Sequence, residues 1–169
     1  MKKPLPSPLP ETKPAPAGTV LKKSSRARKL PLPVSREIIP VIGIGASAGG
    51  LEAFELFFKT MPAKSGMAFI LIPHLDPGHA SMLSDILQRN TRMPVHEAQD
   101  NARIQPDHVY IIPPNKDLTI FNGSISLSTP ELGRGLRLPI DTFFRSLAED
   151  QGERAICVIL SGSGSDGKL

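Results

Sequence analysis

Beyond position 37, hydrophobic residues form short continuous runs separated by segments in which they recur every three or four positions. The continuous runs are typical of strands whose two faces are both covered, and they lie at Glu37–Gly45, Met67–Ile72 and Ala155–Leu160. The intervening periodicity predicts helices at residues 51–61, 81–89 and 139–149. Because strands joined through crossover helices must lie parallel, these segments predict a parallel sheet.

The middle of the chain follows a different pattern, with apolar and polar residues alternating over Leu118–Leu127. This segment is centred on Asn122-Gly123, the strongest short signal for a β-hairpin. Two further short runs, Val95–Ala98 and Val109–Ile112, predict strands that we assign to the same antiparallel insertion. The sequence therefore predicts an α/β fold: a three-layer, mostly parallel, doubly wound sheet with an antiparallel hairpin insertion.

Composition separates the first part of the chain from the rest. Residues 1–40 hold nine of the 18 prolines and carry nine Lys or Arg against two Asp or Glu, whereas residues 41–169 carry eleven against fourteen. The overall charge of +4 therefore belongs to the first part. A Pro- and Lys-rich segment with few apolar residues cannot bury enough surface to offset the entropy of ordering. We expect residues 1–36 to be a disordered, solvated arm with no nucleic-acid partner, and residues 37–169 to be the domain.

The sequence disfavours several classes of protein. No apolar stretch approaches the roughly 20 residues that span a bilayer, and the N-terminus lacks the apolar region of a signal peptide. We therefore expect a cytoplasmic protein without membrane insertion. Cys157 is the only cysteine, which excludes an internal disulfide and a zinc site built on several thiolates. Its apolar neighbours predict that it fills space in a buried strand.

A glycine-rich segment, Gly43–Gly50, joins the first predicted strand to the first predicted helix. Gly43, Gly45 and Ala48 satisfy a relaxed dinucleotide-binding pattern, but the second strand does not end in the acidic residue that would hold a ribose. A serine at a tight strand-to-helix turn, here Ser47, is also the geometry of a nucleophile elbow. A third interpretation is that this serine only caps the helix.

Two more polar residues follow predicted strands. His74 ends the second strand, and Asp166 lies in a Gly-rich turn after the last one. Because parallel strands gather their carboxyl ends at one edge of the sheet, Ser47, His74 and Asp166 form a candidate Ser-His-Asp triad. Taken singly, the histidine could be a satisfied polar residue and the aspartate a turn residue that bonds its own backbone. The other histidines do not end a predicted parallel strand: His79, His96 and His108.

At these residues the sequence resembles the catalytic domain of the chemotaxis protein-glutamate methylesterase family, over roughly Ile38–Leu169. Four segments carry the resemblance in order: Ile42–Gly50, Ile72–His74, Leu138–Phe144 and Val158–Gly167. The order Ser, His, Asp along the chain also differs from the orders in α/β-hydrolases, trypsin-like proteases and subtilisins.

The resemblance implies that Ser47 attacks a glutamyl methyl ester on a chemoreceptor, with His74 as base and then acid and Asp166 orienting it. It also implies deamidation of receptor glutamines by the same route, a role in chemotaxis phosphorelay signalling, and no metal or cofactor. Backbone amides at Ala48 and Ser163 are expected near the oxyanion. Many relatives have threonine at the position of Ala48, so a side-chain hydroxyl is lost there. Many have methionine at the position of Ser163, where the backbone amide is kept.

The chain also departs from the family. We expect no receiver domain before the catalytic domain, because the Pro-rich segment occupies that place. The form of Leu138–Phe144 and Leu160–Gly167 is closer to fusion proteins that join a methylesterase to a methyltransferase. A methyltransferase domain is therefore an implied partner besides the methylated chemoreceptor. The family continues beyond Gly167 with a helix and further strands, so we expect a truncated fold, incomplete at its C-terminus. Two alternatives remain: a nucleotide-binding module, and an inactive docking or regulatory domain.

Overall fold

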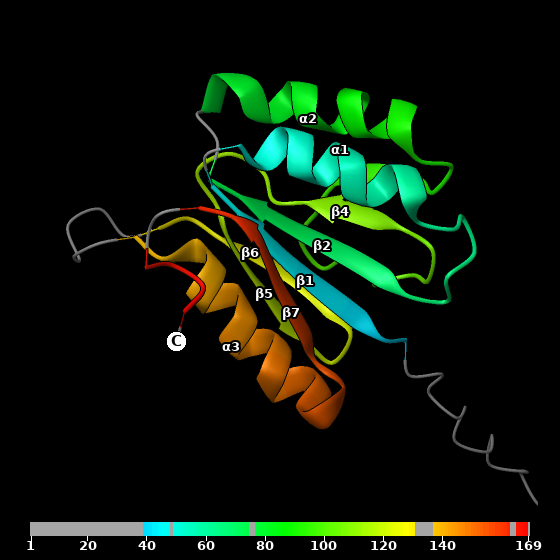
Figure 1. Ribbon diagram of the computed structural model, residues 1–169. Coiled ribbons are helices and arrows are strands. Elements are labelled where there is room, and N and C mark those ends of the chain that lie inside the picture. Colours follow the sequence, from blue (N-terminus) through cyan, green and yellow to red (C-terminus); the bar gives the residue numbers. More distant parts are fainter. Residues whose placement is uncertain (1–38, 48, 75–76, 131–136, 163–164, 169) are drawn as a thin grey trace, which may run out of the picture. The chain divides into compact units, whose positions relative to one another are not determined.

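Among the residues that the computed structural model describes, five parallel strands form the central sheet (Figure 1). The described residues are 39–47, 49–74, 77–130, 137–162 and 165–168. In spatial order the strands are β3 (Val95–Glu97), β4 (Val109–Ile111), β2 (Ala68–Pro73), β1 (Val41–Ala46) and β7 (Ile156–Ser161). Every pairing between neighbours in this sheet is parallel. Since β1 has β2 on one side and β7 on the other, the chain winds outward from it in both directions.

Helices and a hairpin cover the two faces of the sheet (Figure 1). One face carries α1 (Gly50–Thr60) and α2 (Pro77–Asn90), and the other carries α3 (Pro139–Gln151) with the hairpin of β5 (Asp117–Phe121) and β6 (Ser124–Ser128). A short 3-10 helix, Gly152–Arg154, then leads into β7. The prediction of a three-layer, mostly parallel α/β fold with an antiparallel hairpin is confirmed. The boundary at residues 36 and 37, and the disordered arm, stay predictions because residues 1–38 lie outside the described part.

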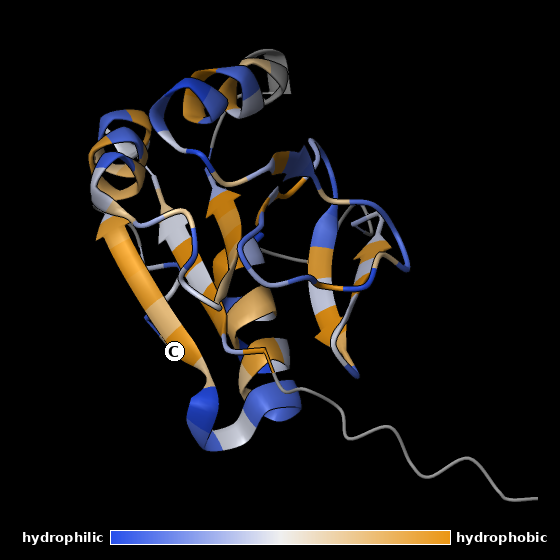
Figure 2. Ribbon diagram, turned by 90° about the vertical axis from the view of Figure 1, so that its right-hand side faces the viewer, coloured by the Kyte–Doolittle hydropathy of each residue, from blue (hydrophilic) through white to orange (hydrophobic). Residues whose placement is uncertain are grey.

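An apolar layer lies on each face of the sheet, between the strands and the elements that cover them. In Figure 2 the strands of the sheet are mainly hydrophobic, while the helices and loops carry most of the polar residues. Alternate residues of each central strand enter opposite layers. Ile44, Phe58 and Leu71 are buried towards α1 and α2, whereas Ile70 and Phe143 are buried towards α3 and the hairpin. Each face of the sheet is thus buried, which explains the continuous apolar runs of β1 and β2.

The middle of the chain corrects one prediction. We expected the two short strands at 95–98 and 109–112 to belong to an antiparallel insertion, but β3 and β4 extend the parallel sheet. Their runs are too short for periodicity to distinguish parallel from antiparallel pairing. His96 consequently lies within a parallel strand. The hairpin prediction is confirmed: Asn122 and Gly123 both have positive φ angles, 53° and 71°, as a two-residue type I′ turn requires.

The last strand, β7, pairs with β1 along one side and is the edge of the sheet in the described part of the chain. Ile156 and Ile159 are 45% and 44% exposed. Cys157 is exposed as well, so the prediction that it fills a buried strand is wrong. Its apolar neighbours indicated a covered strand, whereas exposure depends on which elements lie against it. Partial desolvation still raises the pKa of the Cys157 thiol.

Two glycines of β1 allow α3 to approach the sheet closely. A Cβ atom added to Gly43 would lie 2.7 Å from Phe143 Cε1 and 3.0 Å from Leu147 Cδ2. A Cβ atom at Gly45 would lie 2.7 Å from Ile140 Cγ2. The absence of side chains at these two positions therefore sets the separation between β1 and α3.

The substitution Gly43→Val is expected to lower the free energy of unfolding by about 1–3 kcal/mol or more, because the new side chain overpacks the α3 interface. Urea denaturation measures this change. Ser126→Val, which adds the same side chain at an exposed position of β6, is the matched control and is expected to stay within about 0.5 kcal/mol of the wild type. Equal stabilities for the two variants would contradict the packing role of Gly43.

The loop before β2 is held by Asp107, whose Oδ1 accepts hydrogen bonds from Ser65 N and Gly66 N, each at 2.7 Å. The hydrogen bond from Gly66 is the largest cause that holds the pKa of Asp107 below its ordinary value of 3.8. A carboxyl group whose pKa is lower in the folded than in the unfolded chain stabilises the fold at pH values above its unfolded-state pKa. This stabilisation is lost as the pH falls through the folded-state pKa. Asp107→Asn is therefore expected to lower stability near neutral pH and to leave it unchanged at strongly acidic pH. Chemical denaturation at both pH values checks this, and a pH-independent difference would contradict it.

Candidate active site

The carboxyl ends of β1, β2 and β7 meet at one edge of the sheet, and the candidate residues follow them. The register pairs Ala46 with Pro73, so Ser47 and His74 are the next residues of two adjacent strands. His74 N donates to Ala46 O at 2.7 Å, and Ser47 N donates to Ser161 O at 3.0 Å. This edge is also where the chain reverses its winding direction, the usual place for a ligand in an open α/β sheet.

Ser47 lies in a tight turn between β1 and α1. Its carbonyl accepts a hydrogen bond from Gly50 N at 2.9 Å, and Gly49 precedes the helix with a left-handed φ of 75°. A Cβ atom on Gly162 would lie 3.0 Å from Ser47 Cβ, so a glycine there leaves room beside the serine. Among the described residues, the Ser47 hydroxyl makes no hydrogen bond to His74. Such bonds often form only in the substrate complex.

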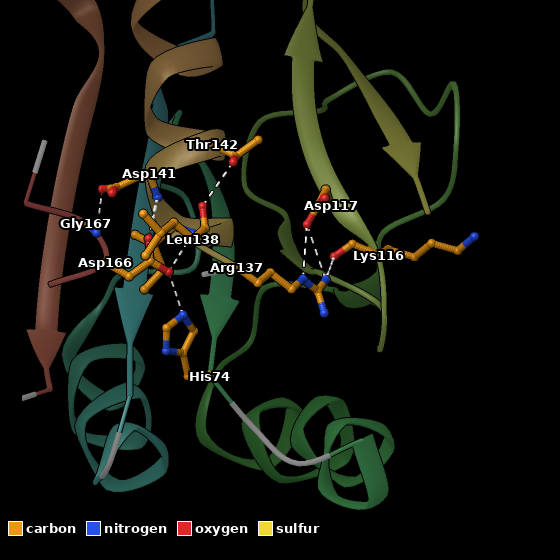
Figure 3. A network of polar contacts seen from close by, with 10 residues as sticks. His74, Lys116, Asp117, Arg137, Leu138, Asp141, Thr142, Asp166 and Gly167 are labelled. Atoms are coloured by element: carbon orange, nitrogen blue, oxygen red, sulfur yellow. Dashed lines mark hydrogen bonds and ion pairs between the residues drawn. The ribbon is translucent and has the colours of Figure 1, made fainter. Parts of the chain in front are cut away.

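His74 and Asp166 form the hydrogen-bonded pair of the site (Figure 3). His74 Nε2 lies 2.6 Å from Asp166 Oδ2; the histidine side chain is 34% exposed and the aspartate only 4%. An ionised carboxylate can only accept hydrogen bonds, and both oxygens of Asp166 also accept from backbone amides, so we assign the imidazole as the donor with its proton on Nε2. The other ring nitrogen, Nδ1, is then the one that can accept a proton.

The N-terminus of α3 binds the carboxylate of Asp166. Ile140 N donates to Oδ2 at 3.1 Å and Asp141 N donates to Oδ1 at 2.8 Å. Pro139 is the first helical residue, a position that suits proline because its missing N–H would have no partner within the helix. Free amides and the helix dipole both stabilise an anion at this end. Asp166 is therefore bonded outside its own turn, contrary to the local alternative.

Asp141 belongs to the same cluster, although sequence analysis assigned it no role. Its Oδ1 accepts a hydrogen bond from Gly167 N at 2.6 Å, and its side chain is buried (Figure 3). The only signal for it was its place within the segment Leu138–Phe144, which carried the family resemblance. No local pattern indicates that residues 141 and 167 meet, because their contact depends on the packing of α3 against the sheet.

A cleft of about 330 Å³ opens beside His74. Its walls are largely apolar and its polar groups come from Asn115, Lys116 and Arg137. The Arg137 guanidinium is held by Asp117 Oδ1, at 3.3 Å, and by the carbonyl of Lys116 (Figure 3). Ser47 does not line this cleft. This cleft thus offers space for a bound molecule beside His74, with the cationic side chains of Lys116 and Arg137 at its border.

Gly43 and Gly45 do not form a phosphate cradle in this fold. Gly43 and Gly45 lie within β1 and face α3, where side chains of the helix occupy the space that a pyrophosphate would need. Steric packing therefore explains both glycines without a nucleotide, which removes the main support for a nucleotide-binding module.

Other site predictions are not tested by the described residues. The oxyanion positions Ala48 and Ser163 lie outside them. In the part that the structure describes, no group of three or more His, Cys, Asp or Glu side chains is placed to hold a metal ion, and no helix is long and apolar enough to cross a membrane.

Comparisons with known proteins agree with the fold. The model of the CheB methylesterase family matches residues 42–169. Proteins named protein-glutamate methylesterase/protein-glutamine glutaminase from Yersinia pestis and Escherichia coli K12 are each 33% identical over 132 residues, covering 75% of this chain and 37% of theirs. The CheB methylesterase catalytic domain of Thermotoga maritima superposes with a TM-score of 0.68 at 27% identity, covering 77% of this chain and 71% of that one. The chain thus spans little more than a third of the curated relatives.

Proposed function

Since this chain belongs to the CheB methylesterase family, we propose that it is the catalytic part of a protein-glutamate methylesterase. The substrates are glutamyl methyl esters of methylated chemoreceptors or similar signalling proteins. The observation that carries the proposal is the His74–Asp166 hydrogen bond beside the strand end that holds Ser47. The names of the relatives extend the proposal to deamidation of protein glutamines.

In the proposed reaction, Ser47 Oγ attacks the ester carbonyl while His74 Nδ1 accepts the hydroxyl proton. Asp166 keeps the other imidazole proton on Nε2 and stabilises the imidazolium that forms. The tetrahedral intermediate collapses when the C–O bond to the methoxy group breaks, and His74 returns the proton to release methanol. Water, activated in turn by His74, then hydrolyses the glutamyl-serine ester and yields a free glutamate. For a glutamine substrate the leaving group is ammonia.

Backbone amides at Ala48 and Ser163 are the proposed donors to the oxyanion. The support for Ala48 is that it follows Ser47 directly in the sequence, two residues before α1 begins at Gly50, and helix N-termini offer free backbone amides to an anion. The support for Ser163 is that the residue before it, Gly162, follows β7 and lies beside Ser47. Such donors require no side-chain chemistry, which suits an alanine and a serine at these positions.

The cleft beside His74 is the proposed binding place for the receptor segment that flanks the ester. Lys116 and Arg137 at its border suit a segment that carries acidic residues. We further propose a cytoplasmic location, no bound cofactor and no nucleic-acid partner. A methyltransferase domain is the proposed second partner, on the likeness of Leu138–Phe144 to fusion proteins.

Methanol release from a methylated chemoreceptor fragment tests the function. The 169-residue chain is expected to release methanol in proportion to enzyme concentration and to produce free carboxylates at the former ester positions, which peptide mass spectrometry identifies. A glutamine-containing fragment measures ammonia release in parallel. No turnover together with saturable binding of the fragment would favour the docking alternative, and neither turnover nor binding would contradict both.

A further inference from the structure

Two carboxylates at the N-terminus of α3 exchange hydrogen bonds with each other's backbone (Figure 3). Asp166 Oδ1 accepts from Asp141 N at 2.8 Å, and Asp141 Oδ1 accepts from Gly167 N at 2.6 Å. Asp141 is only 4% exposed, and its Oδ2 has no hydrogen-bond partner among the described residues. We call this reciprocal pair of bonds the aspartate clasp.

Like a capping box, the aspartate clasp is a reciprocal pair of side-chain-to-backbone hydrogen bonds at a helix N-terminus, but its two residues are far apart in the sequence. Asp166 satisfies free amides of the helix, while Asp141 returns from the third helical position to the amide that follows Asp166. Each aspartate therefore fixes the backbone on which the other is carried, and α3 is tied to the turn after β7.

The turn after β7 depends on contacts with α3 for its conformation, because the backbone at Gly167 can adopt many conformations. Gly167 has a φ of 86°, and glycine occupies many other conformations at similar cost. A Cβ atom at Gly167 would lie 2.4 Å from Ile159 Cδ1, so a stiffer residue does not fit there. The hydrogen bond from Gly167 N to Asp141 is the contact that fixes the amide directly after Asp166.

We propose that Asp141 is a positioning residue of the esterase: by fixing the amide of Gly167 it aims Oδ2 of Asp166 at His74 Nε2, which determines the tautomer of the imidazole. This inference rests on the proposed function for its catalytic consequence. Burying a second carboxylate beside Asp166 is unfavourable unless hydrogen bonds compensate it, which argues against an incidental surface role. Variants of Asp141 can separate the effect of its hydrogen bond to Gly167 N from the effect of its charge.

The test compares Asp141→Ala and Asp141→Asn with the wild-type chain in the methanol-release assay. Asp141→Ala removes the acceptor for Gly167 N and is expected to lower kcat about 10- to 100-fold with KM little changed, because a misplaced Asp166 affects the chemical step rather than binding. In Asp141→Asn the side-chain amide oxygen can still accept from Gly167 N, so most of the kcat is expected to return. Asp150→Ala is the matched control: it removes an acceptor for the amide of Gly123 at the other end of α3 and is expected to leave kcat unchanged.

A second readout does not depend on activity. Two-bond ¹H–¹⁵N correlation spectra of the substrate-free chain report which imidazole nitrogen of His74 carries the proton, with His74→Gln identifying its signals. The Nε2–H tautomer is expected in the wild type, in Asp141→Asn and in Asp150→Ala. A mixture of tautomers is expected in Asp141→Ala.

The two readouts make the failures distinguishable. A shift of tautomer in Asp141→Ala alone supports the positioning role even if the wild type releases no methanol, in which case only the proposed function fails. An unchanged tautomer and kcat in Asp141→Ala would overturn the inference. Equal impairment of Asp141→Ala and Asp141→Asn, in variants that melt cooperatively, would also overturn it, because the acceptor oxygen would then be irrelevant.

Discussion

Replacing Ser47 by alanine is expected to lower kcat for methyl ester hydrolysis about 10⁶-fold, because the variant has no hydroxyl to form the glutamyl-enzyme. Among the described residues, the hydrogen bonds of Ser47 are made by its backbone, to Ser161 and Gly50. The substitution therefore removes the nucleophile without removing a structural contact. Methanol release over long incubations measures the residual rate, and thermal unfolding checks that the fold is intact.

Ser126→Ala is the matched control for this variant, since it deletes the same hydroxyl from an exposed position of β6. It is expected to keep the wild-type rate. A Ser47→Ala variant that retains more than about one hundredth of the wild-type kcat would mean that another group attacks the ester. The proposed role of Ser47 would then be wrong, whereas the family assignment would be unaffected.

Asp166→Asn is expected to lower kcat about 10⁴-fold, the size of effect that an asparagine in the acid position of a Ser-His-Asp triad produces. The asparagine amide donates a hydrogen bond where the carboxylate accepted one. His74 Nε2 must then act as the acceptor, its proton moves to Nδ1, and the imidazole can no longer take the proton of Ser47. Rate measurements and the tautomer spectra of His74 follow the same change independently.

Stability gives the control for Asp166→Asn. The variant keeps one oxygen to accept from the N-terminal amides of α3, so the loss in unfolding free energy is expected to be about 1–2 kcal/mol, far less than the effect on the reaction barrier. Asp150→Asn changes an acid at the opposite end of the same helix and is expected to preserve kcat. If Asp166→Asn retained a rate within tenfold of the wild type, Asp166 would be a helix cap and not a triad member.

Local patterns predicted the elements well. The helical spacing of Phe54 and Phe58 led to α1, and both residues are buried against the sheet. Asn122-Gly123 led to the hairpin, because only a few residue types adopt positive φ at two successive positions. The prediction that α2 begins at residue 81 was late by four residues, since Pro77 is the first helical residue. Proline suits that place and interrupts the apolar pattern on which the prediction rested.

Partners across the sheet were not predictable in the same way. Nothing in the three residues of β3 distinguishes a parallel from an antiparallel neighbour, and the exposure of Cys157 depends on the absence of a covering element over β7 in the described part. The glycines of β1 matched a nucleotide pattern in sequence, yet their cause is the close approach of α3. In each case the deciding contact joins segments that are distant in the chain.

The sequence by itself determined three features of this protein: the order of strands and helices, the family resemblance, and the three polar residues that follow strand ends. It could do so because periodicity and turn chemistry act over a few residues. Only the tertiary structure decided that Asp166 is held by the N-terminus of α3, which imidazole nitrogen of His74 faces Asp166, and that Asp141 bonds the amide of Gly167. These contacts join residues 25 to 92 positions apart, and they exist because α3 packs on one face of the sheet with its N-terminus beside the strand ends.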